Sequence, residues 1–265
     1  MARFKLTLEY NGTRYSGWQV QKNARTVAGE IVAAVRDLSQ REDFELYGAG
    51  RTDAGVHALA QVAHLDLETR LRPDQLLFAL NDRLPADVNL LRVEKVARQF
   101  HARHSAEARA YLYQIARRRT AFGKPFVWWV KDALEVEPMR AAAQAFLGLK
   151  DFRSFTADDP DETSTRVSLE RVEMAEAGAL ILVRVVGSHF LWKMVRRMVG
   201  VLAEVGRGQL RVEDVARLMR QRSELPAALT APPSGLFLER VFYPNEPREW
   251  PLRPVLELAS VAASR

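Results

Sequence analysis

The segment Gly48-Ala49-Gly50-Arg51-Thr52-Asp53-Ala54-Gly55-Val56-His57-Ala58 carries the most information about this chain. It places the carboxylate of Asp53 beside the guanidinium of Arg51 in a loop with three glycines. Apolar runs at residues 44–47 and 60–67 flank the segment and predict a strand, a loop and a second strand. A nearby cation favours the ionised form of a carboxyl group, and glycine permits close approach of other groups. The same residue types are also the commonest residues of ordinary turns.

Four other motifs surround this segment. Residues 10–19 read YNGTRYSGWQ, and residues 100–105 read FHARHS, with RAYLY following at 109–113. Residues 190–200 read FLWKMVRRMVG, and residues 233–238 read PSGLFL. Together with the Asp53 segment they form an ordered series that extends over nearly the whole chain.

In this order, the five motifs resemble those of the tRNA pseudouridine synthases that modify the anticodon stem-loop. The resemblance spans about residues 4–243. Two departures are visible, because Asn11 stands where the family usually has Asp and Tyr15 stands where Phe is common. Neither departure touches the chemistry that the resemblance implies.

The resemblance implies a role for several residues. Asp53 stands at the place of the essential catalytic carboxylate, and Arg51 is expected near the RNA. Tyr111 matches an aromatic residue that stacks on the target base, and Leu236 matches an apolar residue that closes the pocket. Arg196 matches a cation that pairs with the catalytic Asp. Without the resemblance, Tyr111 and Leu236 are interpreted as buried strand residues and Arg196 as a surface arginine.

Basic residues favour a polyanionic partner. The net charge is +6 at pH 7, and the stretch 181–211 holds one acid, Glu204, against six bases: Arg184, Lys193, Arg196, Arg197, Arg207 and Arg211. Such a run is either a solvated face or a phosphate-binding surface, and the resemblance favours phosphate contacts. We therefore add Lys193 and Arg197 of this stretch to the expected substrate contacts, together with Arg109 of the motif at residues 109–113.

Composition bounds the remaining functions. The chain has 265 residues, 48% of them hydrophobic, and no cysteine. Disulfides, thiolate nucleophiles and sulfur-based metal sites are therefore excluded. The N-terminal residues are charged and predict a strand, not a signal peptide, and no apolar run has membrane-spanning length. We expect a cytoplasmic protein with no membrane association.

Hydrophobic periodicity predicts an α+β fold. In the first half we expect strands at 4–10, 44–49, 60–67 and 88–96, and helices at 27–38, capped by Thr26, and from Pro73 to 80. In the second half we expect strands at 111–115, 167–174, 180–186 and 236–243, and helices at 139–147, 192–205 and 210–220.

This order suggests two ferredoxin-like βαββαβ halves. The resemblance implies the pseudouridine synthase fold, in which the halves share a mixed, mainly antiparallel central sheet with helices on the outer face. We place the N-terminal half, with the Asp53 loop, at residues 1–105. The C-terminal half, expected to complete the active-site cleft, is placed at 106–245, and an irregular tail at 246–265. Residues 256–263 of the tail alternatively form a helix.

The implied reaction moves the bond of ribose C1′ from N1 to C5 of uracil, which requires no cofactor. The carboxylate attacks the ring or C1′ covalently, or it stabilises or deprotonates a glycal-like intermediate, and the sequence does not choose between these routes. His101 and His104 have metal-chelating spacing but no third ligand nearby, so we expect no metal. His57 is expected to pack or to contact RNA and not to act as a general base.

The resemblance implies uridines 38, 39 and 40 of the tRNA anticodon stem-loop as targets and a homodimer as the working form. A second interpretation is a non-catalytic RNA-binding protein or RNA chaperone on the same scaffold, because ferredoxin-like sheets also bind RNA through exposed aromatic residues. The set Arg51, Asp53, Tyr111, Arg196 and Leu236 favours the enzyme, since a pure binder has no need for all of these residues.

Overall fold

The first strand, β1 (Ala2–Tyr10), buries Phe4, Leu6, Leu8 and Tyr10 in strict alternation, as the sequence predicts. The computed structural model describes residues 1–159 and 164–260. The chain divides into two compact units, the first made of Met1–Glu107 and Phe237–Pro247, the second of Ala108–Leu236 and Arg248–Arg265. The division falls two residues after the expected boundary at residue 105, and Phe237–Pro247 is grouped with the first unit.

The first unit has the predicted βαββαβ order. Its elements are β1, η1 (Gly12–Arg14), α1 (Val27–Ser39), β2 (Glu45–Gly48), β3 (His57–Leu67), α2 (Pro73–Asn81) and β4 (Val88–Val96), with β10 (Leu236–Phe242) added at the end of the chain. The strand order is β4-β1-β3-β10, and β2 also pairs with β3. All of these pairs are antiparallel except β3 with β10.

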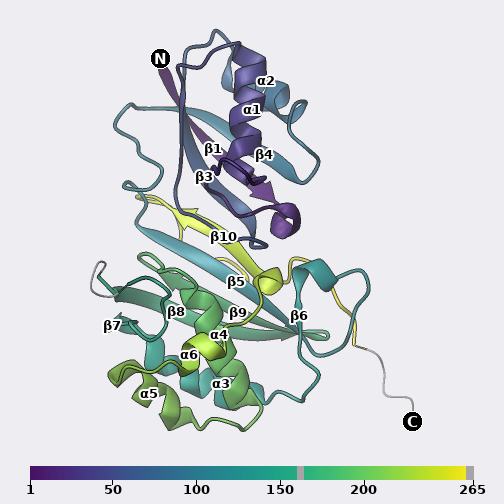
Figure 1. Cartoon of the computed structure of the whole chain (residues 1–265), viewed down its shortest axis with the longest axis vertical. Coiled ribbons are helices and arrows are strands. Elements are labelled where there is room, and N and C mark those ends of the chain that lie inside the picture. Colours follow the sequence, from purple (N-terminus) through teal and green to yellow (C-terminus); the bar gives the residue numbers. More distant parts are fainter. Residues whose placement is uncertain (160–163, 261–265) are drawn as a thin grey trace. The chain divides into compact units, whose positions relative to one another are not determined.

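The helices of the first unit pack on its sheet as their caps and apolar faces predict. The hydroxyl of Thr26 accepts a hydrogen bond from the N–H of Gly29 and caps α1. Pro73 is the first residue of α2, where the missing N–H costs nothing. Figure 1 shows α1 and α2 side by side against the sheet.

The second unit is built on a mainly antiparallel sheet. Its strands are β5 (Ala108–Ala116), β6 (Trp128–Trp129), β7 (Gly148–Asp151), β8 (Arg166–Ala177) and β9 (Leu180–Gly187), ordered β5-β9-β8-β7. The short β6 pairs with β5 in parallel. Gly178, at a φ of 57°, forms the predicted turn between β8 and β9. The α+β class and the mainly antiparallel pairing are therefore confirmed.

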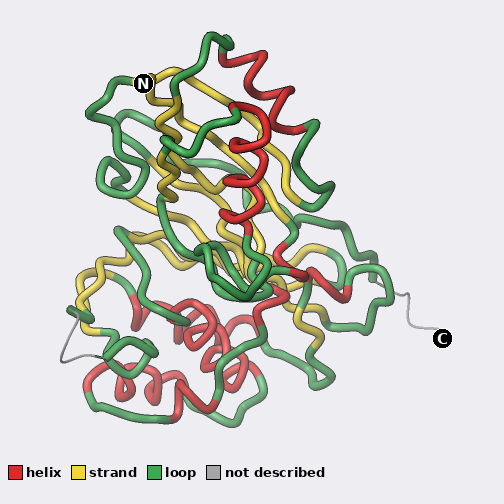
Figure 2. The backbone as a smooth tube through the Cα atoms, turned by 45° about the horizontal axis from the view of Figure 1, so that its top comes forward, coloured by secondary structure: helices red, strands yellow, loops and turns green. Residues whose placement is uncertain are grey.

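The helical elements of this unit are η2 (Lys124–Phe126), α3 (Val136–Ala143), η3 (Gln144–Phe146), α4 (Met194–Gly206), α5 (Val212–Arg220), α6 (Leu225–Ala228) and η4 (Pro233–Gly235). Figure 2 shows the larger ones gathered together in red. The α3 helix begins three residues before the predicted start, because its first turn accommodates Pro138. The α4 helix begins at Met194 and not at Trp192, because Lys193 adopts a left-handed conformation at a φ of 60°.

The chain after Tyr243 is irregular, as predicted. The alternative prediction of a helix at residues 256–263 is wrong for residues 256–260, which are irregular. Residues 261–263 lie outside the described part of the chain. The tail is fixed by Arg184 of β9, whose guanidinium donates to the carbonyls of Trp250 (3.1 Å) and Pro251 (2.9 Å). Arg184 is 1% exposed, so this member of the basic stretch 181–211 holds the tail and does not face a phosphate.

Candidate functional site

Asp53 lies in the first unit, in the loop between β2 and β3. The loop backbone is tied to the opening motif at both ends. The N–H of Trp18 donates to the carbonyl of Thr52 (3.0 Å), and the N–H of Gly55 donates to the carbonyl of Tyr15 (3.3 Å). Inside the loop, the N–H of Val56 donates to the carbonyl of Asp53 (3.1 Å). These bonds hold the backbone on both sides of the Asp53 carboxylate.

The opening motif approaches this loop so closely that two of its positions accept only glycine. A Cβ on Gly12 would lie 1.9 Å from the carbonyl oxygen of Val56. A Cβ on Gly17 would lie 2.5 Å from the carbonyl oxygen of Thr52, and Gly17 also has a φ of 95°. The motif at residues 10–19 therefore acts as a cradle for the Asp53 loop, a role that the sequence did not reveal.

Buried polar side chains lock the cradle to the loop. The hydroxyls of Tyr10 and Thr52 are 2.7 Å apart, and the side-chain amide of Gln61 donates to the carbonyl of Gly50 (3.0 Å). The N–H of Gly12 donates to Nδ1 of His57 (3.0 Å). The ring of His57 stacks on Phe237 with centroids 4.7 Å apart and is buried, so His57 packs inside the first unit, which is the first of the two roles expected for it. Gln61 interrupts an apolar strand, and this was the one signal in the sequence for such a network.

The two departures from the family pattern have local partners. Oδ1 of Asn11 accepts from the N–H of Thr13 (3.1 Å) and caps η1. The hydroxyl of Tyr15 donates to Asp87. Burial, together with that hydrogen bond, raises the pKa of Tyr15 above its ordinary value. Both residues thus make hydrogen bonds within the first unit, Asn11 to η1 and Tyr15 to Asp87.

Within the loop, the side chain of Asp53 is half-buried and that of Arg51 is exposed. Thr52, between them, is buried. A carboxylate in a backbone-anchored loop keeps its orientation when substrate arrives, and an exposed guanidinium beside it suits contact with a phosphate. The first unit thus holds two of the predicted site residues, Asp53 and Arg51.

The other predicted site residues lie in the second unit. Tyr111 is on β5, opposite Val185 of β9, and is 9% exposed. The ring of Phe190 contacts it edge to face, with centroids 4.9 Å apart. Tyr113 is fully buried, and its hydroxyl donates to the carbonyl of Pro232 (2.7 Å). Burial raises the pKa of Tyr113 well above its ordinary value, so this phenol stays protonated and structural.

Arg196, in the first turn of α4, is tied to the segment that leads to Leu236. Its Nε donates to the carbonyl of Ala231 (2.7 Å), and the N–H of Ala231 donates to the carbonyl of Arg196 (3.1 Å). Gly200, one turn later, permits this close packing, because a Cβ there would lie 1.7 Å from the carbonyl oxygen of Leu229. Leu236 begins β10 and is buried. Helix α4 and the chain at residues 229–231 are thus closely packed and hydrogen-bonded to one another.

The three further basic residues have different surroundings. Nη1 of Arg109 donates to the carbonyl of Ser188 (2.9 Å). Nη1 of Arg197 donates to the carbonyls of Ser154 and Thr156, and burial lowers the pKa of Arg197 below its ordinary value. Nζ of Lys193 lies 4.8 Å from the ring centroid of Trp192. Arg197 thus holds a loop, whereas Lys193 presents its ammonium beside an indole.

The rings of His101 and His104 are neighbours, with centroids 4.3 Å apart. Nδ1 of His101 accepts from the N–H groups of Arg103 (3.1 Å) and His104 (3.3 Å). In the described part of the chain, no group of three or more His, Asp or Glu residues is arranged to hold a metal ion. Over the same residues, no helix is both long and apolar enough to cross a membrane.

Comparison with known proteins gives consistent matches. A family described as tRNA pseudouridine synthase matches residues 7–105 and 142–244. The tRNA pseudouridine synthase A of Azorhizobium caulinodans is 41% identical over 249 residues, which are 93% of this chain and 96% of that protein. That of Nitrobacter winogradskyi is 40% identical over 246 residues, covering 92% and 96%. A chain in the crystal structure of a Cbf5-Nop10-Gar1 complex is similar at a TM-score of 0.39 and 12% identity. The alignment covers 77% of this chain and 45% of that chain.

Proposed function

The chain belongs to the tRNA pseudouridine synthase A family, and from this premise we propose that it converts uridines 38, 39 and 40 of the tRNA anticodon stem-loop to pseudouridine with Asp53 as the catalytic carboxylate. Its activity is that of a pseudouridine synthase, an isomerase. The observation that carries the assignment of Asp53 is the cradle, in which Gly12 and Gly17 hold the loop backbone at distances that no other residue permits.

The reaction balances within the nucleotide. The C1′–N1 bond breaks and a C1′–C5 bond forms, while the proton on C5 leaves and N1 of the rearranged base gains one. A carboxylate held in one position can take part in these reaction steps in two ways. It acts as a nucleophile toward the ring or C1′, or it acts as a base and stabilises the charge of a glycal-like intermediate. Each route requires the ionised form of Asp53 at a constant position.

Residues of the second unit are proposed to bind the nucleotide. We assign stacking on the target base to Tyr111 and apolar contact to Leu236. We assign to Arg196 the pairing with the catalytic carboxylate, as the family motif at residues 190–200 implies; the bond from its Nε to the carbonyl of Ala231 holds the guanidinium in place. Arg51, Arg109, Lys193 and Arg197 are proposed as further substrate contacts, with Arg197 also holding the loop at Ser154.

The proposed partner is tRNA, bound by a homodimer in the cytoplasm. The positive net charge supports electrostatic binding to the phosphate backbone. Such binding weakens as the salt concentration rises, because the basic side chains displace counterions from the RNA. Light scattering of the purified protein, with and without tRNA, measures the proposed dimer directly.

The test is pseudouridine mapping on unmodified tRNA transcripts that carry uridine at only one of positions 38, 39 and 40. The purified protein is added without a cofactor. Conversion at these positions supports the proposal, and conversion confined to another arm of the tRNA overturns the assigned positions. Tight tRNA binding without any conversion would support the RNA-binding protein or RNA chaperone instead.

A further inference from the structure

Trp192 is an exposed aromatic side chain on a rigid segment. It is 50% exposed and lies just before α4. Its backbone is fixed on both sides, because its N–H donates to Oδ2 of Asp158 (2.9 Å) and its carbonyl accepts from the N–H of Ala157 (3.0 Å). The indole therefore faces solvent from an anchored backbone and not from a loose loop.

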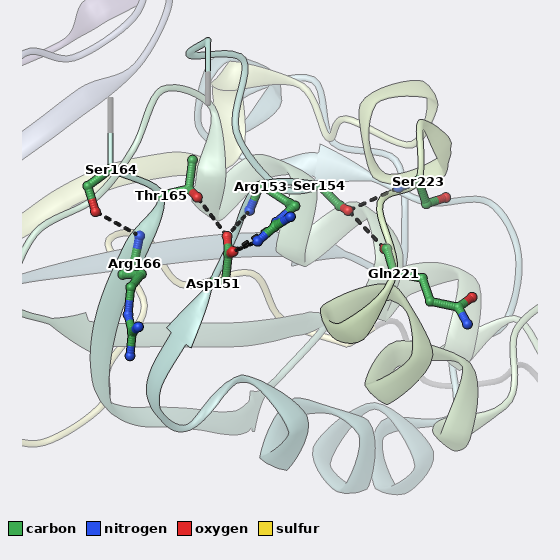
Figure 3. A network of polar contacts seen from close by, with 8 residues as sticks. All are labelled: Asp151, Arg153, Ser154, Ser164, Thr165, Arg166, Gln221 and Ser223. Atoms are coloured by element: carbon green, nitrogen blue, oxygen red, sulfur yellow. Dashed lines mark hydrogen bonds and ion pairs between the residues drawn. The ribbon is translucent and has the colours of Figure 1, made fainter. Parts of the chain in front are cut away.

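The loop that holds Trp192 is itself anchored. The hydroxyl of Ser154 donates to the carbonyl of Gln221 (3.2 Å) and accepts from the N–H of Ser223 (3.1 Å). Figure 3 shows this junction beside Asp151, whose carboxylate accepts from Thr165 (2.6 Å). Arg197 adds its bonds to the carbonyls at Ser154 and Thr156. Hydrogen bonds from three parts of the chain, at residues 221–223, Thr165 and Arg197 of α4, thus hold this loop.

A cation is placed over this indole at a cost. Lys193 adopts a φ of 60°, a left-handed conformation that costs about 1 kcal/mol or more for a residue other than glycine. In this conformation its Nζ lies 4.8 Å from the ring centroid of Trp192. The carboxylate of Asp158 accepts from the backbone N–H of Trp192 and from the hydroxyl of Thr156. The pair thus offers an aromatic face and a positive charge to a ligand.

We propose that Trp192 and Lys193 bind an unpaired nucleotide of the tRNA anticodon loop, the indole stacking on the base and the ammonium contacting a phosphate. This proposal rests on the proposed function. Proteins recognise unpaired RNA nucleotides by stacking bases on aromatic side chains beside cations. The same short segment carries Phe190, which contacts Tyr111. Residues 190–192 therefore place the proposed nucleotide contact, Trp192, two positions after Phe190, which contacts Tyr111, the residue assigned to the target base.

The test compares Trp192→Ala and Trp192→Phe in the full-length protein, with Phe78→Ala on α2 as the control for loss of an exposed aromatic residue (67% exposed). The probe is an unmodified tRNA transcript, and binding is measured by filter retention. We expect Trp192→Ala to raise Kd by about 5- to 100-fold. We expect Trp192→Phe and Phe78→Ala to stay near wild type. Far-UV circular dichroism establishes that each variant is folded.

Transcripts with one abasic position in the anticodon loop identify the bound nucleotide. When the abasic position is the nucleotide that stacks on Trp192, the losses of affinity from the missing base and from Trp192→Ala are not additive. Trp192→Ala then causes no further rise in Kd. Lys193→Gly, which suits the left-handed backbone, is expected to weaken binding and to lower its salt dependence. Unchanged Kd in Trp192→Ala overturns the inference, as does a change in oligomer mass without a change in RNA binding.

The two proposals fail separately. Conversion of uridine by the wild type together with an unchanged Kd in Trp192→Ala leaves the proposed function standing and overturns the role of Trp192. No conversion by the wild type, with binding lost in Trp192→Ala, overturns the proposed reaction and supports the contact to an unpaired nucleotide.

Discussion

The rings of Phe190 and Tyr111 meet edge to face, with centroids 4.9 Å apart and planes inclined by 74°. Phe190 follows β9, whereas Tyr111 lies on β5, so the contact joins the motif before α4 to the proposed base-stacking residue. An edge-to-face pair contributes about 0.5–1.5 kcal/mol beyond its apolar burial and restricts the rotation of both rings. Phe190 is therefore a positioning residue for Tyr111.

We predict that Phe190→Ala lowers the single-turnover rate on bound tRNA by about 2- to 10-fold, because the Tyr111 ring loses its restraint. The variant Phe190→Tyr keeps the ring and is expected to keep most of the rate. Single-turnover pseudouridine formation at saturating enzyme measures both. Equal rates for Phe190→Ala and wild type would show that Tyr111 is positioned without this contact.

A second prediction concerns Gly17, where the backbone conformation and the approach of Thr52 both require glycine. Gly17→Ala is expected to displace the Asp53 loop and to abolish measurable turnover. Gly148→Ala is the matched control, since Gly148 has a similar φ of 85° but open space around it, and should cost only about 1 kcal/mol of stability. Full activity in a folded Gly17→Ala protein would show that the cradle is not needed.

Removing the Tyr10 hydroxyl leaves the buried hydroxyl of Thr52 without that partner. We expect Tyr10→Phe to lower the free energy of unfolding by about 1–2 kcal/mol, measured by urea denaturation. Tyr47→Phe changes an exposed tyrosine, which is 53% accessible, and should alter stability by less than about 0.5 kcal/mol. Equal midpoints for the two variants would mean that the Tyr10 network adds no stability.

His64 makes stability depend on pH. Burial lowers its pKa from 6.5 to about 4, with smaller contributions from Arg3 and His101, and its Nδ1 accepts the N–H of Ala102 (3.1 Å). The unfolded chain binds a proton near pH 6.5, whereas the folded chain binds one only near pH 4. His64 therefore does not reduce the free energy of unfolding above pH 6.5, and it reduces it progressively as the pH falls from 6.5 toward 4.

Between pH 7.5 and 5 we expect a loss of about 2 kcal/mol from this histidine, measured by urea denaturation at each pH. His64→Gln retains an acceptor for Ala102 but does not titrate, so its stability should change less over the same interval. Identical pH dependence in the variant and the wild type would assign the effect to other groups.

Local patterns predicted most of the elements, because alternation and caps act within a few residues. The buried face of β1 and the Thr26 cap are examples. The cradle could not be predicted this way. Gly17 lies against Thr52, which is 35 residues away in the sequence, so the requirement for glycine arises only from the folded structure. Arg184 was misinterpreted for the same reason, because its partners at Trp250 and Pro251 follow it by 66 and 67 residues.

The site residues were recognised through the family motifs and not through their chemistry. Asp53 in isolation is typical of a turn, and Tyr111 is typical of a buried strand. The bond from Arg196 to Ala231 depends on how α4 packs against residues 229–231, which the helical pattern of α4 does not encode. The left-handed conformation of Lys193, which makes α4 begin at Met194 and leaves Trp192 outside the helix, has no signal in the sequence, because lysine is an ordinary helix former.

The most direct measurement is single-turnover pseudouridine formation by Asp53→Asn on an unmodified tRNA transcript, with Kd measured for the same transcript. The substitution keeps the size of the side chain and removes its charge and basicity. The account predicts a loss of turnover of at least about 1,000-fold, with tRNA affinity close to that of the wild type. Turnover within a few-fold of wild type would contradict the role of Asp53 as the catalytic carboxylate.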